Sequence, residues 1–476
     1  MKNLLMICIC FTLLQLKVIN LWAQPQINIE DTSIIKEKNS TLVSIANIEI
    51  KGNKKTRIYI IEREIPFKEG EFMLKNELQK KMELCRQQLM NTALFIDVVV
   101  SINKQANELI FLTIQVKERW YFFPLPYFKL IDRNFNQWWV EQKRSFDRVN
   151  YGLKFMQFNF SGRNDNLNLW LVNGYTTQIS AKYEQPFSDK YLKSGFNIGF
   201  NYSKNREINY ATINNKQAFI KQDKFVRENF HFNITYTYRP AIKTRHNVKL
   251  FYNNDRIIDT VYSLNPDFFS NNLQRISYPE LSYNIQYFNV DYIPYPLKGF
   301  MIDATILKRG FNKNMNLTQL RFNTSFSKPI FSKTYLLLQA AGLLSLPFDQ
   351  PYYNKQLFGT SDLYLRGMEY FVIDGVAGII GRTTVQKEIF KFVFHNPLKI
   401  KGHESIPFKF YLKVFGDLGY AYDKHPSITT TLNNKWLKTW GVGLDVISIY
   451  DFVFRLEYSF NQMGNQGLFV HTKSDF

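Results

Sequence analysis

A chain of 476 residues is long enough for two or three ordinary domains, or for one small domain followed by one large closed sheet. Aromatic residues make up 16% of it, with 43 Phe and 28 Tyr, yet its mean hydropathy is slightly negative. This combination argues against a soluble protein and favours a membrane β-barrel, in which one face of each strand meets lipid and the other meets water. The net charge of +20 is spread without a compact basic run, which argues against nucleic acid as a partner and fits anionic lipid headgroups.

The first residues have the pattern of a secretory signal peptide. Lys2 supplies a short positive region, Leu4 to Leu16 form an apolar stretch, and Ala23 is a small residue directly before a cleavage point. The apolar stretch is too short for a transmembrane helix. We therefore predict an exported protein with a signal peptide over residues 1–23 and a linker over residues 24–42.

The cysteines do not form a disulfide framework. Cys8 and Cys10 lie inside the predicted signal peptide, so only Cys85 remains after cleavage. A lone cysteine at helical spacing is expected to be a small apolar filler rather than a reactive thiol.

Residues 43–118 carry the mixed pattern of a small α+β domain. An alternating strand over 43–51 ends at a Gly-Asn turn, and helical spacing follows over 56–65. Two short strands, 96–102 and 109–116, close the segment. Between them and the first helix lies a second apolar stripe at helical spacing, which comprises Leu74, Leu78, Met82, Cys85 and Leu89. The order β-α-α-β-β predicts a soluble domain with its own core.

Several short motifs in this segment resemble those of a POTRA domain. They are, in order, Ile48-Glu49-Ile50-Lys51-Gly52-Asn53, Thr56, Gly70, Leu89, Phe95-Ile96-Asp97-Val98-Val99-Val100 and Val116-Lys117-Glu118-Arg119. Such a domain offers an exposed strand edge, to which an extended polypeptide can add through main-chain hydrogen bonds. An unrelated small α+β domain is the alternative interpretation.

From residue 119 onward, helical periodicity gives way to strict alternation of apolar and polar residues. Phe230 to Tyr238 and Phe452 to Phe460 are two examples. About sixteen such segments, the first near 120–131 and the last near 466–476, fit the even strand number of single-chain bacterial outer-membrane barrels. We therefore predict a mainly β chain, in which residues 119–476 form a transmembrane antiparallel barrel.

Three motifs in this segment resemble those of the BamA/TamA family of outer-membrane assembly and export proteins. They are Leu365-Arg366-Gly367-Met368 in the longest interruption of the strand pattern, Phe415-Gly416-Asp417-Leu418-Gly419 on a later strand, and the turn Tyr295-Pro296-Leu297-Lys298-Gly299. The resemblance implies that Arg366 and Gly367 form the tip of a loop folded into the lumen and that Asp417 is the carboxylate partner of this tip.

Charge supports this pairing, because an arginine inside a barrel never loses its proton and its guanidinium suits a bidentate carboxylate. Met368 departs from the aromatic residue usual in the family, which puts stacking at the tip in doubt. A solvated loop with an unpaired arginine is the alternative.

The first and last barrel strands carry three candidates for a lateral seam. Pro124 and Pro126 stand two residues apart, so one edge of the first strand loses two N–H donors. We hypothesise that this edge faces the last strand and loosens the seam; the alternative is that the prolines only end the linker from the POTRA domain. The chain ends at Phe476, which resembles the terminal aromatic by which outer-membrane barrels are recognised for assembly.

The sequence lacks the motifs of several catalytic classes. The six His are scattered without H-x-x-x-H spacing, no Cys cluster is present for a metal, and there is neither a G-x-S-x-G elbow nor a phosphate-binding loop. We expect no enzyme activity, no catalytic residues, and no cofactor or metal.

Three functions remain open at this stage. The first is an assembly factor in the bacterial outer membrane, with its POTRA domain in the periplasm, that inserts unfolded polypeptides; accessory lipoproteins are further candidate partners. The second is a dedicated exporter with the Arg366 loop as a plug. The third is a passive porin, against which the POTRA-like segment argues. A single POTRA domain suggests an accessory rather than a principal assembly factor.

Overall fold

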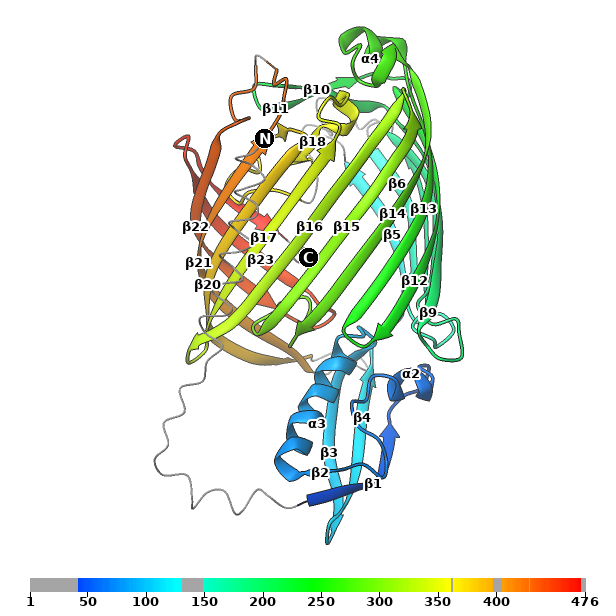
Figure 1. Cartoon of the computed structure of the whole chain (residues 1–476), viewed down its shortest axis with the longest axis vertical. Helices are drawn as coiled ribbons and strands as arrows, with labels where there is room; N and C mark the ends of the chain where they lie inside the picture. The colour runs from blue at the N-terminus through cyan, green and yellow to red at the C-terminus, as the bar shows by residue number, and fades with distance from the viewer. Residues whose placement is uncertain (1–41, 131–148, 361–362, 397–404, 428, 472–476) are drawn as a thin grey trace.

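The computed structural model describes residues 42–130, 149–360, 363–396, 405–427 and 429–471 (Figure 1). The predicted signal peptide, most of the predicted linker and Phe476 lie outside the described residues.

The N-terminal domain is a small sheet covered by helices. Its elements are β1 (Leu42–Lys51), α2 (Ile58–Glu62), β2 (Phe72–Leu74), α3 (Lys75–Met90), β3 (Phe95–Ala106) and β4 (Leu109–Glu118). The strand order is β2-β1-β4-β3, with β1 parallel to β4. Its core includes Ile45, Ile61, Leu78, Cys85, Leu89 and Ile114. The predicted β-α-α-β-β order is confirmed, with one additional short strand.

The additional strand changes where the second helix begins. Residues 72–74 pair with the start of β1, and α3 begins only at Lys75. The helical stripe predicted from Leu74 onward is otherwise present, and it places Leu78, Cys85 and Leu89 in the core. The first helix is shorter than its pattern suggested, since α2 covers five residues.

The second unit is a sixteen-stranded antiparallel sheet, which confirms the predicted fold class. Its strands, in chain order, are β5 (Phe122–Leu130), β6 (Val149–Gln157), β7 (Asn166–Gly174), β8 (Thr176–Gln185), β9 (Ser194–Asn205), β12 (Arg227–Ala241), β13 (Thr244–Ile257), β14 (Arg275–Val290), β15 (Gly299–Asn312), β16 (Met315–Phe331), β17 (Thr334–Leu346), β20 (Ala377–His395), β21 (Ser405–Tyr422), β22 (Trp436–Ile447), β23 (Val453–Asn461) and β24 (Gln466–His471).

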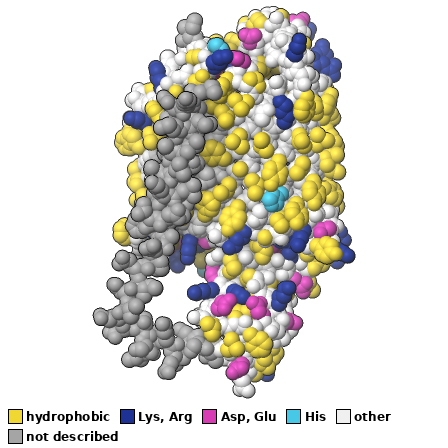
Figure 2. Space-filling view, in the orientation of Figure 1, with side chains coloured by type: hydrophobic (Ala, Val, Ile, Leu, Met, Phe, Trp, Pro, Cys, Tyr) yellow, Lys and Arg dark blue, Asp and Glu magenta, His cyan; other side chains and the backbone are white. Residues whose placement is uncertain are grey.

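Figure 1 shows these strands forming the wall of a barrel, with the N-terminal domain at one open end. Apolar side chains spread over the visible outer wall in Figure 2. Strict alternation produces this surface: Tyr236 is half exposed on the outside, whereas its neighbour Thr235 is buried on the inside. No helix of the described ranges is long and apolar enough to cross a membrane.

Elements that the alternation did not predict lie at the end of the barrel opposite the N-terminal domain (Figure 1). They are the hairpin β10 (Glu207–Ile213) and β11 (Lys216–Lys221), α4 (Asp259–Leu264), the 3-10 helices η3 (Ser270–Asn272) and η4 (Tyr352–Asn354), and the short strands β18 (Gln356–Phe358) and β19 (Ile373–Asp374). The strand predicted over 371–389 begins later, at Ala377, because the residues before it belong to a long loop.

Candidate functional site

The longest loop between barrel strands, residues 347–376 between β17 and β20, is called the lumen loop below. Its tip is buried: Leu365, Arg366 and Met368 are each less than 5% exposed. The tip contacts inward-facing residues of β20, β21 and β23, so it lies inside the barrel rather than on its rim. This is where the sequence resemblance placed it.

Arg366 forms a bidentate ion pair with Asp417 on β21. Its Nε donates to Asp417 Oδ2 over 2.9 Å, and its Nη2 donates to Oδ1. The backbone N–H of Arg366 also donates to Oδ2, over 3.2 Å. Both side chains are at least 97% buried, so the pair is shielded from water and stronger than a surface pair.

Two further contacts hold the guanidinium of Arg366. Its Nη1 donates to Thr384 Oγ1 on β20 over 3.0 Å, and its Cζ lies 4.0 Å from the ring centroid of Phe415. Phe415 therefore supplies an aromatic contact for the arginine from the barrel wall. Thr384 was not identified from the sequence, since a threonine in an alternating strand carries no distinctive signal.

Met368 packs in an apolar cluster instead of stacking on the arginine. The cluster comprises Leu343, Leu357, Phe358, Leu365, Met368, Ile373, Ile380, Ala421, Leu432 and Leu437. Where the sequence resemblance led us to expect an aromatic residue, the chain has a flexible side chain that fills the cluster. The tip is thus anchored by apolar burial on one side and by the ion pair on the other.

Glycines allow the tip to approach the barrel wall. Gly367 has a φ of +86°, and a Cβ at this position would lie 3.0 Å from the Cβ of Ser459. Its carbonyl accepts a hydrogen bond from Asn461 Nδ2 over 2.8 Å. A Cβ on Gly419 would lie 2.9 Å from both methyl groups of Leu365, so this glycine provides the space for the tip.

A second group of buried charged residues lies on β21, β22 and β23, and it was not predicted from the sequence. Lys413 on β21 contacts Asp445 on β22 at 2.5 Å and Glu457 on β23 at 2.6 Å. Tyr295, from the turn between β14 and β15, donates to Asp445 over 2.9 Å. This turn was singled out only as a motif, and nothing in the sequence indicated that its tyrosine enters the barrel.

The two ends of the sheet, β5 and β24, form the candidate seam. They stand at opposite ends of the strand order, and no backbone pairing joins them within the described parts of either strand. The backbone N–H of Phe158 donates to the carbonyl of Tyr121, and the register between β5 and β6 continues without a bulge. Backbone groups of odd-numbered β5 residues therefore point to β6, and those of even-numbered residues point to the seam.

This register places the missing donors of Pro124 and Pro126 on the seam edge. The same edge includes the carbonyl of Phe122, which accepts a hydrogen bond from the indole N–H of Trp120. On the other side of the seam, the backbone N–H of Asn461 donates to the carbonyl of Asn465, which precedes β24. Odd-numbered residues of β24 therefore direct their backbone groups toward β23, and even-numbered residues direct theirs toward the seam. Leu468 and Val470 thus present donors and acceptors to the seam.

The N-terminal domain is fastened to the barrel by two ion pairs. Glu64, which is 1% exposed, accepts two hydrogen bonds from Arg239 at the end of β12. Arg119 donates twice to Asp451 in the turn before β23, over 2.8 and 3.0 Å. Tyr292 donates to the same carboxylate over 2.5 Å. Arg239 and Asp451, which are far apart in the sequence of the barrel, thus both hold the N-terminal domain.

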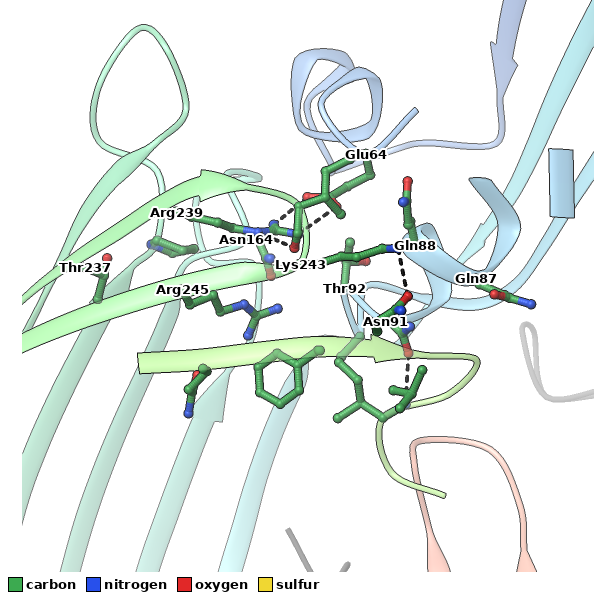
Figure 3. A pocket seen from close by; sticks show the side chains of 18 of the residues that line it. Glu64, Gln87, Gln88, Asn91, Thr92, Asn164, Thr237, Arg239, Lys243 and Arg245 are labelled. Atoms are coloured by element: carbon green, nitrogen blue, oxygen red, sulfur yellow. Dashed lines mark hydrogen bonds and ion pairs between the residues drawn. The ribbon is translucent and has the colours of Figure 1, made fainter. Parts of the chain in front are cut away.

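A cavity of about 580 Å³ lies between these contacts. Figure 3 shows Glu64 and Arg239 facing each other beside it, with Lys243 and Arg245 on the barrel side and Asn91 at the end of α3. The cavity is partly open to solvent and is bordered by polar and apolar residues of both units.

Comparisons with known proteins agree with this architecture. Residues 43–119 match the POTRA family model, described as the surface antigen variable number repeat. No curated protein matches the chain.

Among solved structures, CdiB from Escherichia coli is 11% identical, with a TM-score of 0.50 over 90% of this chain and 75% of that one. BamA from Haemophilus ducreyi lacking POTRA domains 1–3 is 15% identical, with a TM-score of 0.49 over 90% and 83%. CdiB from Acinetobacter baumannii is 12% identical, with a TM-score of 0.46 over 90% and 73%. At these identities the likeness concerns the fold alone.

Proposed function

Because the chain joins a POTRA domain to a sixteen-stranded barrel, which is the organisation of the BamA/TamA-type family, we propose that it is an outer-membrane assembly factor. Unfolded polypeptides dock on the edge of the POTRA sheet in the periplasm and are then templated at the seam between β5 and β24. The observation that carries this proposal is the seam itself: the described residues of β5 and β24 share no backbone pairing, and the β5 edge lacks two donors.

The POTRA sheet supplies the docking edge. In the order β2-β1-β4-β3, strand β3 pairs with β4 on one side only, within the described residues. Val99 and Ile102 on this strand are 48% and 38% exposed. An extended client can therefore add main-chain hydrogen bonds at β3 and gain apolar contacts there, largely independently of its side-chain sequence.

The seam supplies the template. Between Phe122 and Phe128 the seam edge of β5 has no N–H donor, a gap of about 20 Å at the usual rise per residue. Each hydrogen bond that β5 fails to offer is worth about 0.5–1.5 kcal/mol, and more where lipid replaces water. A client strand with all its donors therefore pairs with β24 better than β5 does, and it competes with closure of the barrel.

The filled interior of the barrel favours an assembly factor rather than an open pore. The Arg366 tip enters from one end, and Tyr295 enters from the other, where the POTRA domain lies. Their environments meet: Arg366, Tyr295, Lys413 and Asp445 border the same small void. A passive porin needs neither this filling nor a docking domain.

A dedicated exporter is the second candidate, and the buried lumen loop favours it. If the ion pair with Asp417 opens, the tip can leave the lumen and free a path for one secreted protein. Outer-membrane lipids are partners in either case, because the apolar outer wall requires them. Accessory lipoproteins stay candidate partners of the POTRA domain.

Depletion of the protein, followed by quantitative proteomics of the outer membrane and the medium, tests the proposal. We expect many barrel proteins to fall together. Loss of one secreted protein, with the barrels intact, would instead establish the exporter. A complementary assay presents a urea-unfolded barrel to proteoliposomes that contain the protein and follows its folding by heat-modifiable gel mobility. Empty liposomes give the baseline rate, and equal rates with and without the protein would contradict assembly activity.

A further inference from the structure

Three side chains that can bind a metal converge where the lumen loop meets the last strand. Glu369 belongs to the lumen loop, Glu457 to β23 and His471 to β24. One ligand atom from each lies within 4.8 Å of the others. The sequence predicted no metal site, because its His are scattered and it has no Cys cluster. These three residues are separated by 88 and 14 positions, so no short motif contains them.

Two distances in this cluster, both from His471, match those between ligands of a small cation. His471 Nε2 lies 3.4 Å from Glu369 Oε1 and 3.5 Å from Glu457 Oε2. A direct hydrogen bond would bring nitrogen and oxygen to about 2.7–3.2 Å. Two ligands bound tetrahedrally to zinc at about 2.0–2.1 Å lie about 3.4 Å apart. The separations at His471 fit the second arrangement.

Two of the three ligand groups, Glu369 and His471, have buried polar atoms without a hydrogen bond to any described residue. Both carboxylate oxygens of Glu369 and Nε2 of His471 are shielded from solvent, and none makes a hydrogen bond within the part of the chain that the structure describes. Buried polar atoms are ordinarily satisfied, because an unpaired one costs about 1–3 kcal/mol and a charged one more. A bound cation would satisfy all of these atoms together.

Surrounding residues orient two of the three ligands. The His471 ring stacks on Tyr364 of the lumen loop, with centroids 5.4 Å apart and planes 26° from parallel. Lys413 holds the other oxygen of Glu457, Oε1, which leaves Oε2 directed at His471. The charge of Lys413 is offset by Asp445. Such second contacts fix the direction of metal ligands in known sites.

We propose that Glu369, Glu457 and His471 form a divalent-cation site suited to Zn²⁺. One imidazole nitrogen and two carboxylate oxygens are ligands that zinc accepts, and a water molecule can complete the tetrahedron. The ion joins the lumen loop to β24, the strand at the seam. The binding site stands independently of the proposed function, whereas an effect of the ion on client insertion rests on that function.

Metal binding to the full-length protein tests the site directly. The protein is purified in detergent, stripped with EDTA, titrated with ZnCl₂ and desalted, and the metal is quantified by mass spectrometry. We expect one tightly held Zn²⁺ per chain. His471→Gln and Glu369→Gln should each weaken binding at least 10-fold, whereas His246→Gln, on a distant strand, should leave it unchanged. Equal binding by the wild type and His471→Gln would overturn the proposal.

A second readout separates the metal site from a protonated histidine between two carboxylates. Zn²⁺ at neutral pH should raise the thermal midpoint of the wild type and leave that of Glu369→Gln unchanged. A midpoint that responds to acidification but not to Zn²⁺ would overturn the site. Glu369 belongs to the lumen loop and not to a strand of the barrel wall, so its variant should retain a folded barrel, which heat-modifiable gel mobility verifies. Client insertion with and without Zn²⁺ is measured separately, and its failure to change would leave the site intact.

Discussion

Arg366 and Asp417, which are 51 positions apart in the chain, form a bidentate ion pair in which both side chains are almost completely buried. Removing one partner of such a pair leaves a buried charge without compensation, at a cost of about 3–5 kcal/mol. The pair therefore matters less as a source of net stability than as a device that holds the lumen loop in one position.

The first prediction concerns this pair. Asp417→Asn should release the lumen loop, lower the thermal midpoint of the barrel and expose the tip to protease. Arg366→Lys should show a smaller effect in the same direction, because an ammonium keeps the charge but loses the bidentate geometry. Limited proteolysis and heat-modifiable gel mobility measure both effects.

Asp349→Asn is the matched control for Asp417→Asn. Asp349 pairs with Lys424 at 2.8 Å, but this pair is exposed, so its loss should change the midpoint little. Equal behaviour of the two variants would show that the buried pair does not hold the loop.

The second prediction concerns the contact between the POTRA domain and the barrel. Burial, and then the charge of Arg239, lower the pKa of Arg63, and Glu64 opposes this shift. Glu64→Gln should leave two arginines facing each other and move the POTRA domain away from the barrel. Spin-label distances between α3 and the turn at Asp451 should lengthen and broaden.

Glu83→Gln serves as the control for this change. Glu83 pairs with Arg86 on the surface of α3, at 2.7 Å and with both side chains about half exposed. An unchanged distance distribution in Glu64→Gln, indistinguishable from that of Glu83→Gln, would mean that the ion pair does not fasten the domain.

The third prediction concerns Cys85, which is completely buried in the POTRA core. Burial, followed by the charge of Glu64, raises the pKa of its thiol from 9.0 to about 12. Because the thiolate is the reactive form, iodoacetamide at pH 8 should label Cys85 only after urea unfolds the domain. Rapid labelling of the folded protein, detected by mass spectrometry, would contradict this.

The same shift predicts a pH dependence of stability. The folded domain binds the thiol proton more tightly than the unfolded chain does, so the stabilisation is fully present below pH 9 and is lost as the pH rises through about 12. Cys85→Ala should reduce this alkaline loss, although it also removes buried volume and lowers stability at neutral pH. Urea midpoints at pH 7 and pH 10 for both proteins measure the difference.

The parts of the fold that repeat along the chain could be predicted, and the parts that depend on distant contacts could not. Alternation such as that from Phe230 to Tyr238 reports which face meets lipid, and it therefore locates strands. Arg366 and Asp417 were recognised because each lies in a short motif. Thr384 and Lys413 carry no local signal, and the motif that contains Tyr295 did not indicate that its side chain enters the barrel. Their roles arise only when the wall closes around them.

The register of β5 against β6 also could not be predicted from the sequence. The two prolines of β5 indicate that one edge is deficient, but the choice of edge follows from the pairing of β5 with β6, in which the Phe158 N–H donates to the Tyr121 carbonyl. A shift of one residue would reverse the edges.

The fourth prediction follows from that register. Pro124→Thr together with Pro126→Thr restores two donors on the seam edge of β5, so β24 should pair with β5 more completely. The closed barrel should become more stable, and client insertion should become slower. Oxidative cross-linking of cysteine pairs placed across β5 and β24 measures the first effect, and folding of a urea-unfolded client in proteoliposomes measures the second.

Pro329→Thr provides the control, because this residue lies on β16 opposite Tyr335, away from the seam. It should alter neither cross-linking at the seam nor the insertion rate. If the double variant of β5 behaves in the same way, the prolines do not weaken the seam, and they serve only to end the connection from the POTRA domain. If cross-linking increases while insertion stays unchanged, the seam is weakened by the prolines but clients do not enter there, and export through the lumen becomes the better account.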